Sequence, residues 1–192
     1  MNWTREGFES HVGAVGVLLA DGNEPGPVYF DLGSGGHFEK STDWWVYDGT
    51  MRRPTATTLR GRCACGWRGE GTYPVDWGQV RDDGPGGYDT SGPERDWDEH
   101  MGQVAAAAWV LPEDLADLLR RLRGRLDELL DDAPLAVVKA AGDLEAIVTD
   151  TGPAAASLVR KAETPLSRIA ELLGMTEKEA DSRLDHYWYL GL

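Results

Sequence analysis

Hydrophobic positions recur along the chain with two different periods, and the period changes near residue 110. Before that point, short apolar runs alternate with glycine, proline and aspartate, which is typical of strands joined by turns. After it, leucine and alanine recur three and four positions apart, which is typical of amphipathic helices. The sequence therefore predicts an α+β protein with two domains, a β-rich module over residues 1–110 and a helical domain over residues 111–192.

Short apolar runs predict the strands of the front module. Val12–Leu19 and Val28–Phe30 each end at a glycine-containing turn. Trp44–Tyr47 is followed by an Asp-Gly pair, which tolerates the positive φ of a tight hairpin turn. We therefore expect an antiparallel hairpin whose return strand is Thr55–Trp67. The following stretch, Gly69–Gly92, is rich in glycine, aspartate and proline and is expected to be a long irregular loop.

The first helix is expected to begin near Pro93. Its apolar residues at helical spacing are Trp97, Met101, Val104 and Ala108. A second helix is expected to start at Pro112, because proline suits the first helical position and the acidic residues after it suit the positive end of the helix dipole. Its apolar stripe consists of Leu115, Leu118, Leu119, Leu122, Leu126, Leu129 and Leu130. We interpret this stripe as core or as a dimer seam.

Two further helices are expected to start at Pro134 and at Pro153, the latter running to about Glu163. The side chains expected to be buried in the first of them are Leu135, Val138, Leu144, Ile147 and Val148.

The composition limits the classes of partner. The formal net charge is −14 and both halves are acidic, which excludes a protein whose whole surface holds nucleic acid. Ordinary solubility explains such a charge, and the alternative is an acidic face for a basic partner. No apolar run reaches the length of a membrane span and no export signal is visible, so we expect a cytoplasmic protein without a membrane segment.

Both cysteines of the chain lie in one short motif. Cys63 and Cys65 are separated by one residue, which places both sulfurs on the same side of an extended backbone, where one soft cation can bind both. A tetrahedral site needs two more ligands, and of the four histidines His37 and His100 lie nearest in sequence. A strained Cys-x-Cys disulfide and two free buried thiols are the alternatives. A metal with ligands on both sides of Gly69–Gly92 would also fasten that loop.

The motif Cys63-x-Cys65-Gly66-Trp67-x-Gly69, followed by Trp97-x-x-His100, resembles a zinc-ribbon-like module of small, mostly uncharacterised bacterial proteins. The resemblance covers roughly residues 37–100 and implies zinc as cofactor, with Cys63, Cys65 and His100 as ligands. His37 is the expected fourth ligand, because it leads into a strand that could lie beside the cysteines. The open substitutes for it are Asp96, Asp98, Glu99 or a water.

The segment Thr164–Leu184 resembles the helix-turn-helix of bacterial transcription regulators. Gly174 stands where the turn needs a left-handed residue, and Thr176 with Glu179 forms a capping box for the second helix. The resemblance implies DNA binding, for which the favourable residues are Lys178, Ser182 and Arg183. Acidic residues outnumber basic ones in this segment, which favours a helical scaffold or protein-docking module as the alternative.

The sequence gives little support for an enzyme. No glycine-rich loop has the context of a phosphate-binding motif. The enzymatic alternative is a catalytic zinc held by Cys63, Cys65, one histidine and a water, but the cysteine spacing differs from that of zinc deaminases. We therefore expect a zinc-binding regulatory protein, not an enzyme, that binds DNA through its C-terminal segment. The alternative is an acidic interaction factor that binds a basic protein or mimics nucleic acid, and a homodimer is compatible with either.

Overall fold

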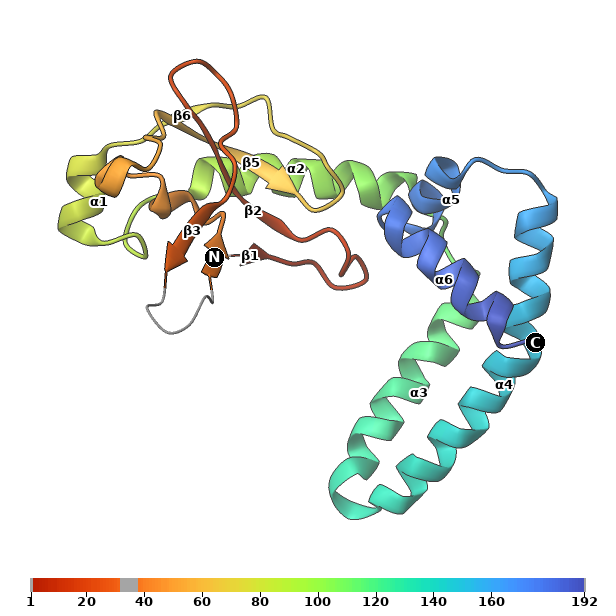
Figure 1. Ribbon diagram of the computed structural model, residues 1–192. Helices are drawn as coiled ribbons and strands as arrows, with labels where there is room; N and C mark the ends of the chain where they lie inside the picture. The colour runs from red at the N-terminus through yellow and green to blue at the C-terminus, as the bar shows by residue number, and fades with distance from the viewer. Residues whose placement is uncertain (1, 32–37, 192) are drawn as a thin grey trace. The chain divides into compact units, whose positions relative to one another are not determined.

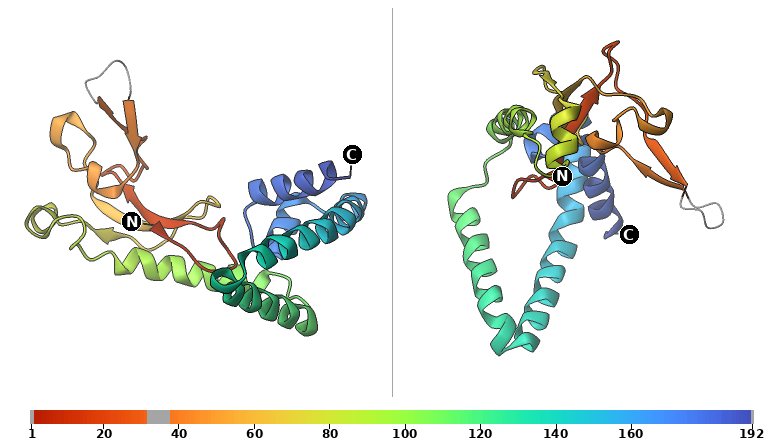
Figure 2. Two further views of the ribbon diagram at one scale, coloured as in Figure 1. Left: turned by 90° about the horizontal axis from the view of Figure 1, so that it is seen from below. Right: turned by 90° about the vertical axis from the view of Figure 1, so that its left-hand side faces the viewer.

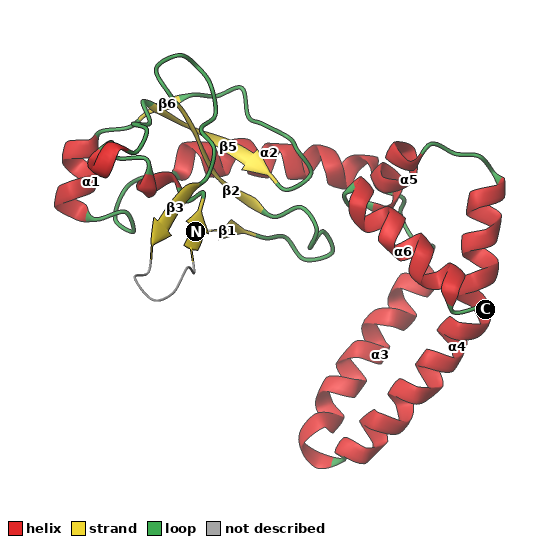
Figure 3. Ribbon diagram, viewed as in Figure 1, coloured by secondary structure: helices red, strands yellow, loops and turns green. Residues whose placement is uncertain are grey.

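The computed structural model describes residues 2–31 and 38–191 (Figure 1). The predicted α+β class is confirmed, with small antiparallel sheets in the first part and helices in the second. The chain forms two compact units, Met1–Ala106 and Ala107–Leu192. Figure 3 shows the strands confined to the first unit.

The first unit is built on a four-stranded antiparallel sheet with the order β1-β2-β5-β6. Its strands are β1 (Asn2–Trp3), β2 (Gly13–Leu18), β5 (Thr58–Cys63) and β6 (Tyr73–Pro74). The central pair β2 and β5 aligns Gly13 with Cys63 and Leu18 with Thr58. A separate two-stranded sheet pairs β3 (Val28–Asp31) with β4 (Phe38–Ser41).

Helix α2 (Ser91–Ala107) lies along one face of the four-stranded sheet, as Figure 2 shows. Glycines on the sheet allow the close approach. A Cβ at Gly13 would come within 2.6 Å of the Trp97 ring, and one at Gly61 within 2.7 Å of the Pro93 carbonyl oxygen. Trp97 and Met101 are the buried apolar residues of this helix, and Trp97 packs against Trp3 with ring centroids 6.0 Å apart. The side of the helix on which the sequence predicts apolar residues therefore faces the main core.

The predicted hairpin at Trp44–Tyr47 is wrong. Trp44–Val46 is a short 3-10 helix, a second one follows at Thr50–Arg52, and β5 pairs with β2 and β6 instead. Three of the four side chains in Trp44–Tyr47 are buried, so the run does not alternate between two faces as a half-buried strand must. In place of the expected hairpin, the structure has an isolated β-bridge between Asp48 and Thr55.

The predicted loop Gly69–Gly92 is also wrong, because it contains β6 and helix α1 (Trp77–Asp83). The Asp76 side chain caps this helix by accepting from the backbone N–H groups of Gly78 and Gln79. Such a cap satisfies amide donors that the first turn leaves without partners. The indole of Trp77 then fastens the helix by donating to the Ala56 carbonyl at 2.8 Å.

The second unit consists of four helices: α3 (Glu113–Asp132), α4 (Pro134–Lys161), α5 (Leu166–Leu173) and α6 (Glu177–Tyr189). Helix α3 begins directly after Pro112, as predicted. Helices α3 and α4 run antiparallel from a turn at Ala133 (Figures 1 and 2).

The predicted start of a separate helix at Pro153 is wrong, since α4 continues through this residue. Tertiary packing accounts for the continuity, because α6 lies along this part of α4 and a Cβ at Gly152 would come 3.1 Å from the Tyr187 ring. The predicted burial along α4 is wrong too. Leu135 and Val138 are 83% and 68% exposed, Ile147 and Val148 are exposed, and Leu144 is half-buried. Four leucines of α3 are exposed as well, namely Leu115, Leu118, Leu119 and Leu130.

No helix within residues 2–31 and 38–191 combines the length and the apolar character needed to span a membrane.

Candidate metal centre

Two histidines and two cysteines converge in the first unit. They are His11, Cys63, Cys65 and His100, and their four ligand atoms all lie within 4.8 Å of one another. His11, Cys63 and His100 are buried, and Cys65 is half-buried. The group joins the segment before β2, the end of β5 and the middle of α2.

The backbone after β5 turns sharply so that both sulfurs face the same point. The Gly66 N–H donates to the Cys63 carbonyl, and the Cys63 N–H donates to the Trp67 carbonyl, each at 3.0 Å. Gly66 has a φ of 98°, a conformation that side-chain-bearing residues rarely adopt. The Ala64 N–H donates to the Val12 carbonyl at 2.8 Å, which fastens the turn to the segment that carries His11.

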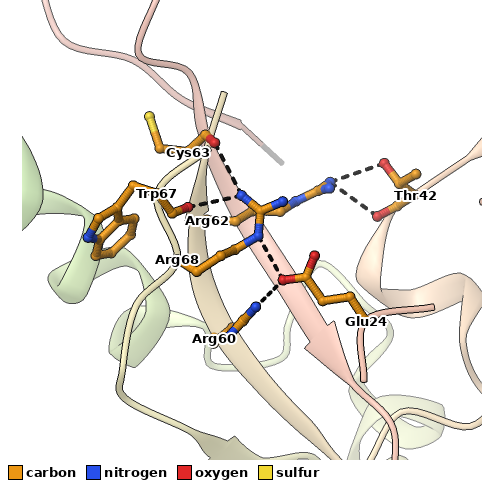
Figure 4. Close-up of polar contacts among 7 residues, drawn as sticks. All are labelled: Glu24, Thr42, Arg60, Arg62, Cys63, Trp67 and Arg68. Atoms are coloured by element: carbon orange, nitrogen blue, oxygen red, sulfur yellow. Dashed lines mark hydrogen bonds and ion pairs between the residues drawn. The ribbon is translucent and has the colours of Figure 1, made fainter. Parts of the chain in front are cut away.

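Arg68 holds the same turn from outside (Figure 4). Its Nη1 donates to the carbonyl oxygens of Cys63 at 3.4 Å and Trp67 at 3.0 Å, while its Nε donates to Glu24 at 2.7 Å. A guanidinium has five donors in one plane, so a single side chain can bind two carbonyls and a carboxylate. Arg68 is therefore a positioning residue for the cysteine turn.

His100 is oriented by stacking as well as by its helix. The Trp67 ring lies parallel to the imidazole, with centroids 4.5 Å apart and planes inclined by 7°. Trp97 and Met101, on the same helix, are buried in the core and fix the rotation of α2. His100 is thus aimed at the cysteines by two independent contacts.

The distances between ligand atoms match a tetrahedral metal site. Cys63 Sγ lies 3.6 Å from His11 Nδ1, and Cys65 Sγ lies 3.5 Å from His100 Nε2. Zinc bonds of about 2.3 Å to sulfur and about 2.0 Å to nitrogen, at the tetrahedral angle, place such pairs about 3.5 Å apart. Two of the sulfur–nitrogen pairs therefore already have the separation that one shared zinc ion requires.

The pKa values of the two thiols are shifted in opposite directions. A hydrogen bond from Cys65 lowers the pKa of Cys63, against the effect of burial and with help from His100 and His11. The same hydrogen bond, together with burial, raises the pKa of Cys65. A divalent cation supplies the positive charge that allows both sulfurs to be thiolates.

The structure brings together three of the four metal ligands expected from the sequence, Cys63, Cys65 and His100. His37 lies outside the described residues, and His11 completes the described group. The carboxylates that the sequence offered as alternative fourth ligands are not part of this group. Asp96 accepts a hydrogen bond from the Tyr73 hydroxyl at 2.8 Å, and Asp98 and Glu99 are exposed.

His11 was missed because closeness in sequence was the criterion for choosing the histidine. The deciding signal is strand register, since the antiparallel pairing of β2 with β5 sets Gly13 opposite Cys63 and so brings His11 to the cysteine turn. Both cysteines are free, so the disulfide alternative does not hold in this structure.

The predicted DNA-contacting residues lie in the second unit. Lys178, Ser182 and Arg183 are exposed on α6, and Arg183 Nη2 lies 3.8 Å from Glu179 Oε1. Gly174 ends α5 in the left-handed conformation, and the Thr176 hydroxyl accepts from the Glu179 N–H. Ile169, Ala170 and Ala180 form the buried contact between the two helices.

No family model, curated protein or solved structure matches this chain.

Proposed function

We propose that this chain is a zinc-binding regulatory protein in which a closed His2Cys2 centre holds the first unit together and the helical second unit joins two copies. The observation that carries the zinc assignment is the pair of sulfur–nitrogen distances, 3.6 and 3.5 Å, between ligands from three separate segments. Cysteines and histidines that serve only as core packing are not expected to place their sulfur and nitrogen atoms at the separations of a tetrahedral metal site.

The donor atoms favour zinc over other ions. Two sulfurs and two imidazole nitrogens form a tetrahedral set typical of structural zinc, whereas calcium and magnesium take oxygen ligands. Two thiolates also balance the charge of a divalent ion. Four protein ligands fill the tetrahedron and leave no position for a water, which supports a structural role and not a catalytic one.

Cobalt substitution tests the proposed coordination. Apo protein reconstituted with Co²⁺ is expected to bind one ion per chain and to show visible d–d absorption of tetrahedral intensity, with a thiolate-to-cobalt charge-transfer band in the near ultraviolet. Zn²⁺ is expected to displace the cobalt and remove both bands. Weak absorption typical of six-coordinate cobalt, or binding with no charge-transfer band, would contradict a tetrahedral site with two thiolates.

The second unit exposes an apolar seam that a second copy can cover. Five leucines of α3 repeat at intervals of four and three residues, the spacing of a helical seam. They are Leu115, Leu119, Leu122, Leu126 and Leu129. Leu115 and Leu119 of this seam are 42% and 50% exposed, and Leu122, Leu126 and Leu129 are half-buried. Exposed apolar faces of this kind mark contact surfaces.

Charge complementarity points to a second copy as the occupant. The middle of α3 carries the basic residues Arg120, Arg121, Arg123 and Arg125. The middle of α4 carries the acidic residues Asp143, Glu145 and Asp150. Both stretches lie at similar distances along the chain from the turn at Ala133. In a two-fold symmetric dimer in which α3 of each copy packs against α4 of the other, the basic stretch therefore meets the acidic stretch at both of the equivalent contacts.

A mass measurement tests this pairing. The native chain is expected to sediment at twice its 21.0 kDa, and Leu119→Glu is expected to sediment as a monomer because it buries a carboxylate in the seam. The matched control is Leu173→Glu, since Leu173 is an exposed leucine of α5, outside the seam. A native chain that is monomeric at high micromolar concentration would remove the proposal.

DNA binding through α6 is the second candidate function. The left-handed Gly174 and the capping Thr176 favour it, because they give α5 and α6 the turn of a helix-turn-helix. The charges of α6 oppose it, since Glu177, Glu179 and Asp181 surround Lys178 and Arg183. Titration with duplex DNA tests this function. An affinity for DNA that falls steeply with salt concentration and weakens in Arg183→Ala supports DNA binding through α6, whereas no binding at low salt excludes it.

A further inference from the structure

Three arginines gather beside a single carboxylate on the outer face of the sheet (Figure 4). Arg60 and Arg62 lie on β5, and Arg68 follows the cysteine turn. One oxygen of Glu24 accepts from both Arg60 and Arg68. Burial acts to raise the pKa of Glu24, but the hydrogen bonds from Arg68 and Arg60 outweigh it and hold the pKa below its ordinary value.

Arg62 has no carboxylate partner among the described residues. Its terminal nitrogen donates to the carbonyl oxygen and the hydroxyl of Thr42, at 3.2 and 3.1 Å. The Nε atoms of Arg60 and Arg62 are both buried with no acceptor in the described part of the chain. Three guanidinium groups with one carboxylate leave a local surplus of positive charge in a protein whose net charge is −14.

The strand geometry forces these charges together. Leu59, Gly61 and Cys63 face the core, so alternation places Arg60 and Arg62 side by side on the opposite face of β5. Arg62 also forms a backbone bridge with Arg68, and like charges in paired strand positions repel. An additional anion between them would relieve this repulsion.

A small cavity opens beside Arg62, the one arginine of the three that lines it. It has a volume of about 40 Å³ and is lined by residues that include Gly16, Glu24, Thr42, Tyr47 and Arg62. A single water needs about 10–15 Å³ of such volume, so the cavity has room for a small oxyanion group. Gly16 lies opposite Arg60 across the strands, and a Cβ at this position would come within 3.3 Å of the Arg62 side chain, so the glycine makes room for Arg62 on this face.

We propose that this arginine cluster, formed by Arg60, Arg62 and Arg68, binds an oxyanion group, a phosphate or a carboxylate, with Glu24 as an internal competitor for the same donors. Arg62 supplies the principal contact, because its planar fork can bind two oxygens of the anion at once. Thr42 offers its hydroxyl beside Arg62. Glu24 occupies Arg60 and Arg68 until the anion enters.

Titration of the zinc-loaded chain with inorganic phosphate or acetate, followed by NMR of the arginine Nε–Hε groups, tests the proposal. Sodium chloride at matched ionic strength is the control. Saturable shifts of the Arg60 and Arg62 signals are expected with at least one of the two anions and not with chloride. Whichever of phosphate and acetate binds more tightly identifies the chemical class of the group. Equal shifts with chloride, or none with either anion, would overturn the site.

Two variants sharpen this test. Arg62→Lys keeps the charge but loses the fork, and is expected to weaken binding at least ten-fold. Glu24→Gln removes the competitor and is expected to tighten binding about five-fold. Arg81→Lys is the matched control, because Arg81 is an exposed arginine of α1 in the same unit, and should change nothing. Zinc content of one per chain verifies that each variant is folded. Unchanged affinity in both Arg62→Lys and Glu24→Gln would contradict the proposal.

Discussion

Cys63→Ser is expected to lose its zinc and to unfold the first unit, while the helices of the second unit remain. The reason is the size of the contribution, since structural zinc supplies about 10–16 kcal/mol of apparent binding energy to small folds, and a serine hydroxyl does not replace a thiolate. We expect metal analysis to fall from one zinc per chain to less than about one tenth. The tryptophan near-ultraviolet circular dichroism should collapse, because six of the eight tryptophans lie in the first unit.

A pair of histidine variants decides which imidazole completes the centre. His11→Ala is expected to lose zinc as Cys63→Ser does, because His11 Nδ1 lies 3.6 Å from Cys63 Sγ. His37→Ala is the matched control and is expected to keep one zinc per chain. The reverse result would return the fourth ligand to His37. Since all four ligands bind metal only when deprotonated, the bound zinc should be lost as the pH falls and regained as it rises.

Trp97→Ala is expected to destabilise the first unit by about 3–5 kcal/mol, the cost of removing a large buried aromatic side chain. Trp97 is 3% exposed, packs against Trp3, and fills the space that Gly13 leaves on the sheet. Its removal leaves a cavity between α2 and the sheet and loosens the helix that carries His100. Zinc affinity should therefore fall together with the denaturation midpoint.

Trp109→Ala provides the comparison, because Trp109 is 72% exposed. It is expected to change the unfolding free energy by less than about 0.5 kcal/mol. Chemical denaturation of zinc-loaded protein, followed by circular dichroism, measures both variants. Similar effects of the two substitutions would show that α2 is not held on the sheet by Trp97.

Local sequence patterns were sufficient for some parts of the fold. Pro112 marked the start of α3, and the spacing of Trp97 and Met101 identified the buried face of α2. The Cys63 and Cys65 motif, with His100, indicated most of the candidate metal centre. The first two features depend on residues a few positions apart, and the third on recognising a cysteine motif and a histidine of the next long helix.

Features that depend on tertiary packing could not be predicted in this way. The register of β2 against β5 brought His11 to the cysteines, and packing of Tyr187 at Gly152 carried α4 through Pro153. One local signal was overlooked. Asp76 followed by Gln79 is a helix-start pattern, and it lies inside the stretch that was expected to be a loop.

The spread of the four ligands along the chain has a consequence for biosynthesis. His100 emerges from the ribosome only after His11, β5 and α1 have been synthesised. Metal loading must therefore wait until most of α2 has left the exit tunnel. Until then Cys63 and Cys65 lack one of the four ligands, so we expect their thiols to be more open to oxidation in the nascent chain than in the metal-loaded centre.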